Sequence, residues 1–360
     1  MKKLLLISNI PAPYMLKSIY EMQKYFDTQY WFYDDIENSS RANWWKIERP
    51  KNAIILDNVL RYKAKYISLN IKEKLEKFNP DIIILGGFSI PTNMYIYKWA
   101  KNKNKKVIAF SEFLRDKKGF ERKNFFTKLL FKFYKNIDAI FAVGEHGVKY
   151  FMNFFDKNKI FNIDYPNDID EHLKHPFREV RQDIKILYSH RLIDIYNPLL
   201  AIDIFKKFNE KYPLSTMKMN ASGNLRKICE EKIKEYKLER KITFLDDIKS
   251  WNDLHLVYKE CDISISPLNF SNGNNSITEA MASGMGIVIS KNVNFNDVLL
   301  KKSKGGFIVD NNVDSFIEAM EQYMQDKELF KKHAIANREV VKEFSIENMT
   351  KKYVNIIQKL

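Results

Sequence analysis

Short runs of apolar residues alternate with amphipathic segments along almost the whole chain, and this alternation most constrains the fold. Segments such as 14–26 and 93–102 have helical periodicity and separate the runs. Strands that alternate with helices in this way are typical of a doubly wound sheet of parallel strands. The first five predicted strands are KKLLLIS (2–8), TQYWFY (28–33), PDIIILGG (80–87), KKVIAFS (105–111) and DAIFAVG (138–144).

A second series of strands begins after a polar stretch near 165–180. A chain of 360 residues is also too long for one ordinary hydrophobic core. We therefore predict the α/β class, with two domains of similar size joined near that stretch. The strands of the second series are IKILYSH (184–190), STMKMNASG (215–223), KITFLDD (241–247), CDISISPL (261–268), GIVIS (286–290) and GGFIV (305–309).

The composition excludes several classes of protein. No run approaches the ~18–20 apolar residues of a membrane span, and the apolar run at the start stops after Ile7, which favours a strand over a signal peptide. Cys229 and Cys261 are too few for a disulfide framework, and the six histidines lack metal-ligand spacing. We expect a cytoplasmic protein without a bound metal or cofactor.

The formal net charge is +15, and most of the excess is scattered lysine. This charge could serve nucleic acid, an anionic membrane surface or phosphorylated small molecules, and it could equally reflect genome composition alone. The chain carries no recognised nucleic-acid-binding motif, so we expect no nucleic-acid partner.

Arg191 is a candidate site residue because it directly follows a predicted strand that ends near His190. Ligands of doubly wound sheets sit at the carboxyl ends of strands, and an arginine there suits bidentate binding of a phosphate. The alternative is a solvated arginine in a surface ion pair. The next helix is expected to begin with Asn197 as its N-cap and Pro198 at its first position.

A second candidate lies in the segment NGNNSITEAMASG (272–284). Ser276 and Glu279 have the spacing of a capping box, in which the glutamate bonds back to the N-cap amide. A loop rich in Asn and Gly before a helix N-terminus is also typical of an anion site. The residues alone leave both interpretations of Glu279 open. The loop residues in question are Asn272, Gly273, Asn274 and Asn275.

These segments together resemble the C-terminal half of retaining GT-B glycosyltransferases of family four, the glycosyl transferases group 1. The most specific part is 275–284, and the segments NIPAPY (9–14) and PDIIILGGF (80–88) also fit the family. The resemblance implies two Rossmann-like domains facing a central cleft. The N-terminal domain, 1–168, would bind the acceptor, and the C-terminal domain, 169–344, the nucleotide-sugar. A C-terminal helix at 345–360 would pack back on the N-terminal domain.

By this resemblance, Arg191 binds the diphosphate of the donor and Glu279 bonds its ribose. The loop 272–275 and the helix start at Ser276 would add backbone amides. Two positions depart from the family. Tyr196 stands where a phosphate-binding lysine is usual, and Ser271 stands where the first of two glutamates is usual. Ser271 could still bond a sugar hydroxyl or phosphate, and Arg226 or Lys227 could replace the lost charge.

Strand-end residues of the N-terminal domain are candidates for contacts with the sugar or the acceptor. Glu112 could instead have a surface or capping role, and His146 could simply cap the helix predicted at 147–155. The full set of candidates is Asn9, Pro13, Gly87, Glu112 and His146.

The segment KGFERKNFFTKLLFKFYKN (118–136) combines apolar residues near helical spacing with regularly placed lysines. Such a segment is typical of a peripheral membrane helix and also of a core helix with a solvated lysine face. Lipid-linked acceptors are common in the family, so we expect this segment to contact an anionic membrane. The lysines are Lys123, Lys128, Lys132 and Lys135.

We therefore predict a hexosyltransferase of the EC 2.4 type that acts in surface polysaccharide biosynthesis. It would move a sugar from a nucleotide diphosphate-sugar, UDP-linked, to a lipid-linked glycan acceptor with retention of configuration. It would work in the cytoplasm or on the inner face of the plasma membrane. The alternative is a degenerate GT-B protein that binds nucleotide or glycan without catalysis, in keeping with the changes at Tyr196 and Ser271.

Overall fold

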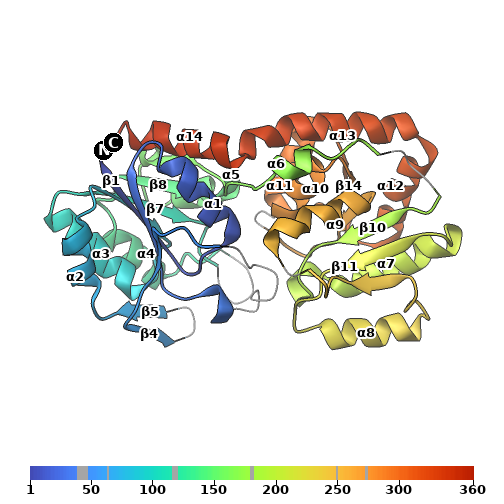
Figure 1. Ribbon diagram of the computed structural model, residues 1–360, viewed down its shortest axis with the longest axis horizontal. Helices are drawn as coiled ribbons and strands as arrows, with labels where there is room; N and C mark the ends of the chain where they lie inside the picture. The colour runs from blue at the N-terminus through green and yellow to red at the C-terminus, as the bar shows by residue number, and fades with distance from the viewer. Residues whose placement is uncertain (39–47, 63–64, 116–120, 179–181, 249, 272–274) are drawn as a thin grey trace. The chain divides into compact units, whose positions relative to one another are not determined.

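The computed structural model of the 360-residue protein describes residues 1–38, 48–62, 65–115, 121–178, 182–248, 250–271 and 275–360. The described residues form two compact units, which are shown in Figure 1. The N-terminal unit runs to Pro166 and also includes Ile346–Leu360, and the C-terminal unit is Asn167–Ser345. Each unit is built around its own parallel sheet, so the predicted α/β class with two Rossmann-like domains is confirmed.

The N-terminal sheet has seven parallel strands in the order β3-β2-β1-β6-β7-β8-β9. All five predicted strands are present, and the central ones are continuous apolar runs because helices cover both faces. The three-residue edge strands β3 and β9 were not predicted, nor was the antiparallel hairpin β4–β5. The bounds are β1 Lys3–Ser8, β2 Asp27–Phe32, β3 Ala53–Ile55, β4 Val59–Tyr62, β5 Lys65–Ser68, β6 Ile82–Gly86, β7 Lys106–Ser111, β8 Ala139–Ala142 and β9 Ile160–Asn162.

Helices connect these strands, and the last helix of the chain packs against the same N-terminal unit. Proline stands at the first position of α1 and α3, where its missing N–H costs nothing. Helix α14 packs on α1, and its Tyr353 hydroxyl donates to the carbonyl oxygen of Asp164 at 2.6 Å. The bounds are α1 Pro13–Met22, η1 Ile36–Asn38, α2 Ile71–Phe78, α3 Pro91–Asn102, α4 Phe125–Phe133, α5 Gly144–Phe151, η2 Lys157–Lys159 and α14 Ile346–Ile357.

The C-terminal sheet has six parallel strands in the order β12-β11-β10-β13-β14-β15. Each strand lies inside one of the six predicted runs. Chain order therefore reverses direction between β10 and β13, the first and fourth strands of this unit. The bounds are β10 Lys185–Tyr188, β11 Thr216–Met219, β12 Ile242–Phe244, β13 Ile263–Ser266, β14 Gly286–Ser290 and β15 Phe307–Val309.

Apolar clusters cover the two faces of the C-terminal sheet. Phe205 of α7 and Tyr323 of α12 pack in one cluster, and Met281 of α10 and Leu299 of α11 in the other. All four side chains are almost fully buried. The helices are α6 Asp170–Leu173, η3 Asp194–Tyr196, α7 Pro198–Lys211, α8 Arg226–Glu235, η4 Trp251–Asp253, α9 Leu254–Glu260, α10 Asn275–Ala282, α11 Asn294–Ser303, α12 Val313–Gln325, α13 Lys327–Val341 and η5 Lys342–Phe344.

The loop after β11 supports the loop after β10. The amide of Leu192 donates to the carbonyl of Ser222 at 2.7 Å, and the amide of Leu225 donates to the carbonyl of Leu192 at 2.9 Å. Gly223 lies between these bonds with a φ of +149°, and a Cβ placed there would lie 2.2 Å from the Leu192 oxygen. Only glycine fits this close approach of two backbones.

We expect Gly223→Ala to lower the free energy of unfolding of the C-terminal unit by about 3 kcal/mol, through backbone strain and the clash with Leu192. Chemical denaturation with site-specific fluorescence would measure this loss. Gly147→Ala is the control, because its new Cβ makes an ordinary contact at 3.6 Å inside helix α5. Equal stability of the two variants would contradict this account of the loop.

Candidate functional site

The reversal of strand order in the C-terminal sheet marks where a ligand is expected. In open α/β sheets, ligands bind outside the carboxyl ends of the two strands at which the order reverses. Here these strands are β10 and β13, and the segments that leave them carry His190, Arg191 and Ser271. The start of helix α10 follows the second of these segments.

A buried histidine bridges the two strands at this point. The Nε2 atom of His190 lies 2.7 Å from the hydroxyl of Ser266, the last residue of β13. Its Nδ1 atom lies 3.3 Å from the hydroxyl of Ser276 in the first turn of α10. Burial lowers the pKa of His190 to about 3, so the ring is neutral at physiological pH. The histidine therefore links the end of β10, the end of β13 and the start of α10 without adding charge.

Arg191 is half-buried and follows this histidine directly. Its position is set by the backbone bonds of Leu192 to the loop after β11. Asn197 takes the N-cap position of α7, with Pro198 first in the helix, as predicted. Asn197 has a left-handed φ of 51°, and its side chain donates to Asn269 at 3.4 Å rather than to the helix.

Tyr196 fills the position where the resemblance leads one to expect a lysine. Its ring lies 5.9 Å from the ring of His190, and its carbonyl accepts a 2.8 Å bond from the hydroxyl of Tyr188. Tyr196 is thus half-buried against the histidine that organises the site. An aromatic ring takes the place of the missing cation.

Glu279 is 3% exposed, and its carboxylate contacts a tyrosine rather than the first turn of its own helix. The hydroxyl of Tyr258, on α9, donates to Glu279 Oε2 at 2.7 Å. Burial, together with the charge of Asp168, raises the pKa of Glu279 to about 7, and the bond from Tyr258 opposes that rise. Glu279 is therefore poised between its neutral and ionised forms near neutral pH.

The capping-box interpretation of Ser276 and Glu279 is wrong. Helix α10 begins at Asn275, so Ser276 already lies inside the helix and Glu279 is its fifth residue. A capping box needs the serine at the N-cap and the glutamate three residues later, at N3. The Ser276 hydroxyl instead faces His190.

Other predicted donor-site residues have varied surroundings. Ser271 is buried, and its amide donates to the carbonyl of Asn292 at 3.1 Å. Asn275 and Ser276 are half-buried at the start of α10. The predicted loop residues Asn272, Gly273 and Asn274 lie outside the described residues.

Arg226, proposed as a replacement for the lost lysine, is held by two carboxylates. Its guanidinium bonds both oxygens of Asp246 at 3.0 Å and Glu230 Oε1 at 2.7 Å. It also lies 3.6 Å above the ring centroid of Phe244. A phosphate would have to compete with these carboxylates for the guanidinium. The role of Arg226 in phosphate binding therefore stays a prediction.

Three predicted acceptor-side residues lie at the carboxyl ends of β1 and β6, where the N-terminal sheet reverses its own order. Asn9 is exposed just after β1, and its carbonyl accepts the amide of Asp34 at 2.9 Å. Pro13 is buried as the first residue of α1. Gly87 follows β6 with a φ of +91°, and its amide donates to Phe110.

Glu112 and His146, the other two candidates, each have a charged neighbour. Glu112 follows β7, bonds Arg115 at 2.8 Å and accepts a 3.4 Å bond from the hydroxyl of Tyr165. His146, in the first turn of α5, lies 3.0 Å from Glu121. The five acceptor-side candidates therefore share the carboxyl edge of one sheet.

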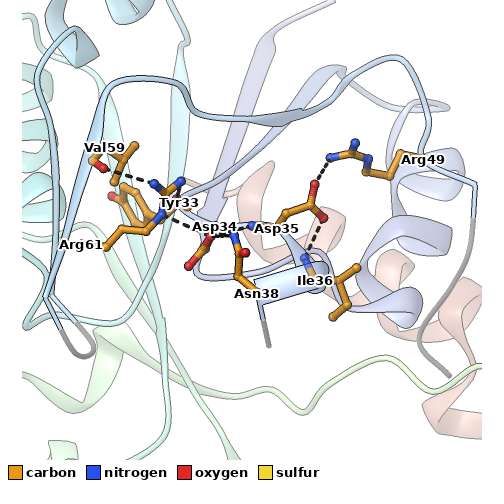
Figure 2. Close-up of polar contacts among 8 residues, drawn as sticks. All are labelled: Tyr33, Asp34, Asp35, Ile36, Asn38, Arg49, Val59 and Arg61. Carbon is orange, nitrogen blue, oxygen red and sulfur yellow. Dashed lines mark hydrogen bonds and ion pairs between the residues drawn. The ribbon is translucent and has the colours of Figure 1, made fainter. Parts of the chain in front are cut away.

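A network of charged side chains lies near this edge, after β2, and was not predicted as a group. Arg61 of the hairpin lies 3.2 Å from Asp34 Oδ1 and donates to the carbonyl of Tyr33 at 3.1 Å. Figure 2 shows these side chains together. Arg49 bonds Asp35 at 3.0 Å. The sequence contains the pair Asp34–Asp35. It gives no sign that Arg61 would contact this pair, because the hairpin that carries Arg61 was not predicted. The network fixes the loop that lies beside Asn9.

Comparison with known proteins places the two units in a wider context. Residues 170–340 match the family described as Glycosyl transferases group 1. A comparison with curated protein sequences finds no match.

Solved structures share the fold over the full chain. A glycosyltransferase from Rickettsia africae is 17% identical, with 99% of this chain and 98% of that chain covered and a TM-score of 0.77. A sucrose-phosphate synthase from Thermosynechococcus elongatus is 13% identical, with 100% and 99% covered and a TM-score of 0.74. The Anabaena protein HepE, in complex with UDP-glucose, is 11% identical, with both chains fully covered and a TM-score of 0.75. At these identities the likeness shows the GT-B fold.

We expect Tyr258→Phe to raise the pKa of Glu279 by roughly 1 or more above its value in the unmodified protein, because the variant loses the donor that favours the ionised carboxylate. NMR titration of ¹³C-labelled glutamate carboxyls would follow this change. Tyr236→Phe, which removes a hydroxyl bonded to Asp203, is the matched control and should leave Glu279 unaffected. An unchanged titration in Tyr258→Phe would show that the hydroxyl does not support the charge of Glu279.

Proposed function

We propose that the protein transfers a sugar from a nucleotide diphosphate-sugar to a glycan acceptor, on the premise that residues 170–340 match the glycosyl transferases group 1 family. The family match supports this activity, and the shared fold is compatible with it. One observation supports the proposed donor site: where the strand order reverses, His190 links the segment that carries Arg191 to the start of α10, the helix that also carries Glu279.

Arg191 and the start of α10 suit the diphosphate of the donor. The first amides of a helix have no partner within the helix, and the helix dipole makes this end attractive to anions. His190 brings the start of α10 to the segment that carries Arg191. Because this histidine is neutral, the positive potential comes from the arginine and the helix.

Glu279 suits the ribose. One carboxylate oxygen accepts the bond from Tyr258, and the other has no hydrogen-bond partner within the part of the chain that the structure describes. That oxygen can accept a bond from a ribose hydroxyl, and charged hydrogen bonds of this kind contribute roughly 1.5–3 kcal/mol. The tyrosine fixes the carboxylate so that little rotational freedom is lost on binding.

The proposed chemistry follows from where charge develops. As the bond between the sugar and the diphosphate breaks, negative charge grows on the departing phosphate. Arg191 and the helix dipole are placed to stabilise that charge in the transition state. We infer retention of configuration, with the departing phosphate as the base that takes the proton of the acceptor hydroxyl. UDP is the proposed nucleotide, since HepE, which shares the fold, was solved with UDP-glucose.

The competing candidate is a GT-B protein that binds nucleotide or glycan without turnover. It is favoured by the aromatic Tyr196, by the uncharged Ser271 and by the carboxylates that hold Arg226. Release of free sugar or transfer from a panel of nucleotide-sugars separates the two functions. The binding-only candidate predicts nucleotide affinity with no turnover of any donor.

We propose that the acceptor is a lipid-linked glycan of surface polysaccharide synthesis, met in the cytoplasm at the inner face of the plasma membrane. Among the described residues, no helix is long and apolar enough to cross a bilayer. We propose that contact with lipid is made through the segment 118–136, of which 118–120 lie outside the described residues.

We expect Arg191→Ala to lower turnover of the donor by on the order of 10²-fold or more, because it removes a charge that is needed most in the transition state. The melting temperature should change little, since this side chain is only half-buried. Arg240→Ala, an exposed arginine of the same unit, is the control and should retain full turnover. A variant of Arg191 that unfolds but keeps its specific activity would show the arginine to be structural.

Glu279→Gln should separate a ligand role from a structural one. The pKa of Glu279 is about 7, so the unmodified protein should bind UDP about tenfold more tightly at pH 8 than at pH 6 through this group. The glutamine variant should lose that gain and bind about tenfold more weakly at pH 8, but almost normally at pH 6. Calorimetry would measure UDP binding to both proteins at each pH. The ionisation of UDP itself affects both proteins equally and cancels in the comparison. If UDP affinity depended on pH in the same way in both proteins, Glu279 would have only a structural role.

A further inference from the structure

Large apolar side chains are exposed on two elements of the N-terminal unit. One element is the hairpin β4–β5, and the other is helix α4. Isolated exposed apolar residues are ordinary, but a group of this size on two short elements marks an interaction surface. The eight side chains are Leu60, Tyr62, Ile67 and Leu69 on or next to the hairpin and Phe125, Phe126, Leu129 and Phe133 on the helix, and they are 39–72% exposed.

The hairpin presents an apolar face outward. Leu60 pairs directly with Ile67 across the two strands, so both side chains lie on one face. The opposite face carries Val59 and Tyr66, which are buried against the unit. An antiparallel sheet with one solvated face usually carries polar residues there. This hairpin carries apolar residues on both faces.

Helix α4 is likewise apolar on its outer side. Thr127 and Phe131 are its buried residues, and they face the unit. Phe125, Leu129 and Phe133 are four residues apart and form one exposed row. A surface helix normally turns such a row toward the core. In α4 the apolar row is exposed, which does not fit a core helix that exposes only a lysine face.

Both elements contact the same short loop. Lys65 of the hairpin donates from Nζ to the carbonyl of Ser89 at 2.6 Å. Tyr134, at the end of α4, donates from its hydroxyl to the carbonyl of Phe88 at 3.1 Å. Figure 1 shows the hairpin and α4 in the same N-terminal unit. The loop follows β6 and begins with Gly87, an acceptor-side candidate.

The charge of the two elements decides between possible occupants. Residues 59–69 and 122–136 contain eight Lys and Arg and no Asp or Glu, and two of these cations, Arg61 and Lys123, pair with Asp34 and Glu121 outside the two ranges. Lys128, Lys132 and Lys135 are exposed beside the apolar row of α4. A second copy of the chain on a two-fold axis would place like charges against each other, which disfavours self-association. An anionic partner that also accepts apolar side chains suits the surface.

We propose that the hairpin β4–β5 and helix α4 together form a docking surface for a bilayer that contains anionic lipids. The phenylalanines and leucines enter the boundary between headgroups and acyl chains, and the lysines contact anionic headgroups. The surface flanks the loop of Gly87, so a lipid-linked acceptor would meet the protein beside its carboxyl sheet edge. Only this last point rests on the proposed function.

Co-sedimentation of the full chain with vesicles of phosphatidylcholine and phosphatidylglycerol tests the proposal. We expect Leu60→Ser with Ile67→Ser, and separately Phe125→Ser with Leu129→Ser, to weaken binding at least tenfold each. Replacing Lys128, Lys132 and Lys135 by Gln should weaken it about fivefold per lysine and reduce its dependence on salt. Vesicles of pure phosphatidylcholine should bind the unmodified protein weakly.

The control is Leu214→Ser with Ile335→Ser, which removes two exposed apolar side chains of the C-terminal unit and should leave vesicle binding unchanged. UDP affinity, measured on the same proteins, reports the donor site separately from the lipid surface. Equal vesicle binding by the unmodified protein and the hairpin variant would remove the hairpin from the surface. Vesicle binding that is unchanged in both apolar variants would overturn the proposal. So would a dimer that these substitutions dissociate while vesicle binding stays the same.

Discussion

The C-terminal site depends on the hydrogen bond between His190 and Ser266, which joins the ends of strands β10 and β13. Strands β10 and β13 are neighbours in the sheet, but their chain connections lead to opposite sides. The neutral imidazole of His190 links the segments that follow these two strands. It also contacts Ser276 at the start of α10. Because the ring is fully buried and its pKa is about 3, it can join these elements without repelling the arginine that follows it. This buried group therefore links the segment of Arg191 to the start of α10, and the backbone bonds of Leu192 to the loop after β11 hold that segment in place.

The two units use the same topology for different purposes. Each sheet reverses its order between its first and fourth main strands, and in each the candidate residues lie at the carboxyl ends there. In the C-terminal unit, that edge carries a helix start, an arginine and a buried carboxylate. In the N-terminal unit, it carries exposed polar residues and a loop, begun by Gly87, that is contacted by two apolar elements rich in lysine. The surplus of lysine in the sequence thus has a local use on the N-terminal unit, where no acidic residue accompanies it on those elements.

The sequence predicted the parts of this structure that depend on local pattern. Short strand-like runs identified all six strands of the C-terminal sheet, and Asn197–Pro198 identified the start of α7. The hairpin was missed because its strands are only four residues long and its exposed face carries Leu60 and Ile67, where an antiparallel strand usually carries polar residues. The capping box was wrong because the helix begins at Asn275, which spacing alone does not decide. The contact of Tyr258 with Glu279 joins residues 21 positions apart on two helices, and no local pattern carries it.

A crystal structure of the protein with UDP tests the central claim most directly. The account predicts that the diphosphate lies at the start of α10 with its oxygens within hydrogen-bond distance of the Arg191 guanidinium. The ribose hydroxyls would then bond the Glu279 oxygen that Tyr258 leaves available. A nucleotide bound elsewhere on the C-terminal unit, or one held at the start of α10 with Arg191 turned away and Glu279 bonded only to Tyr258, would contradict the account.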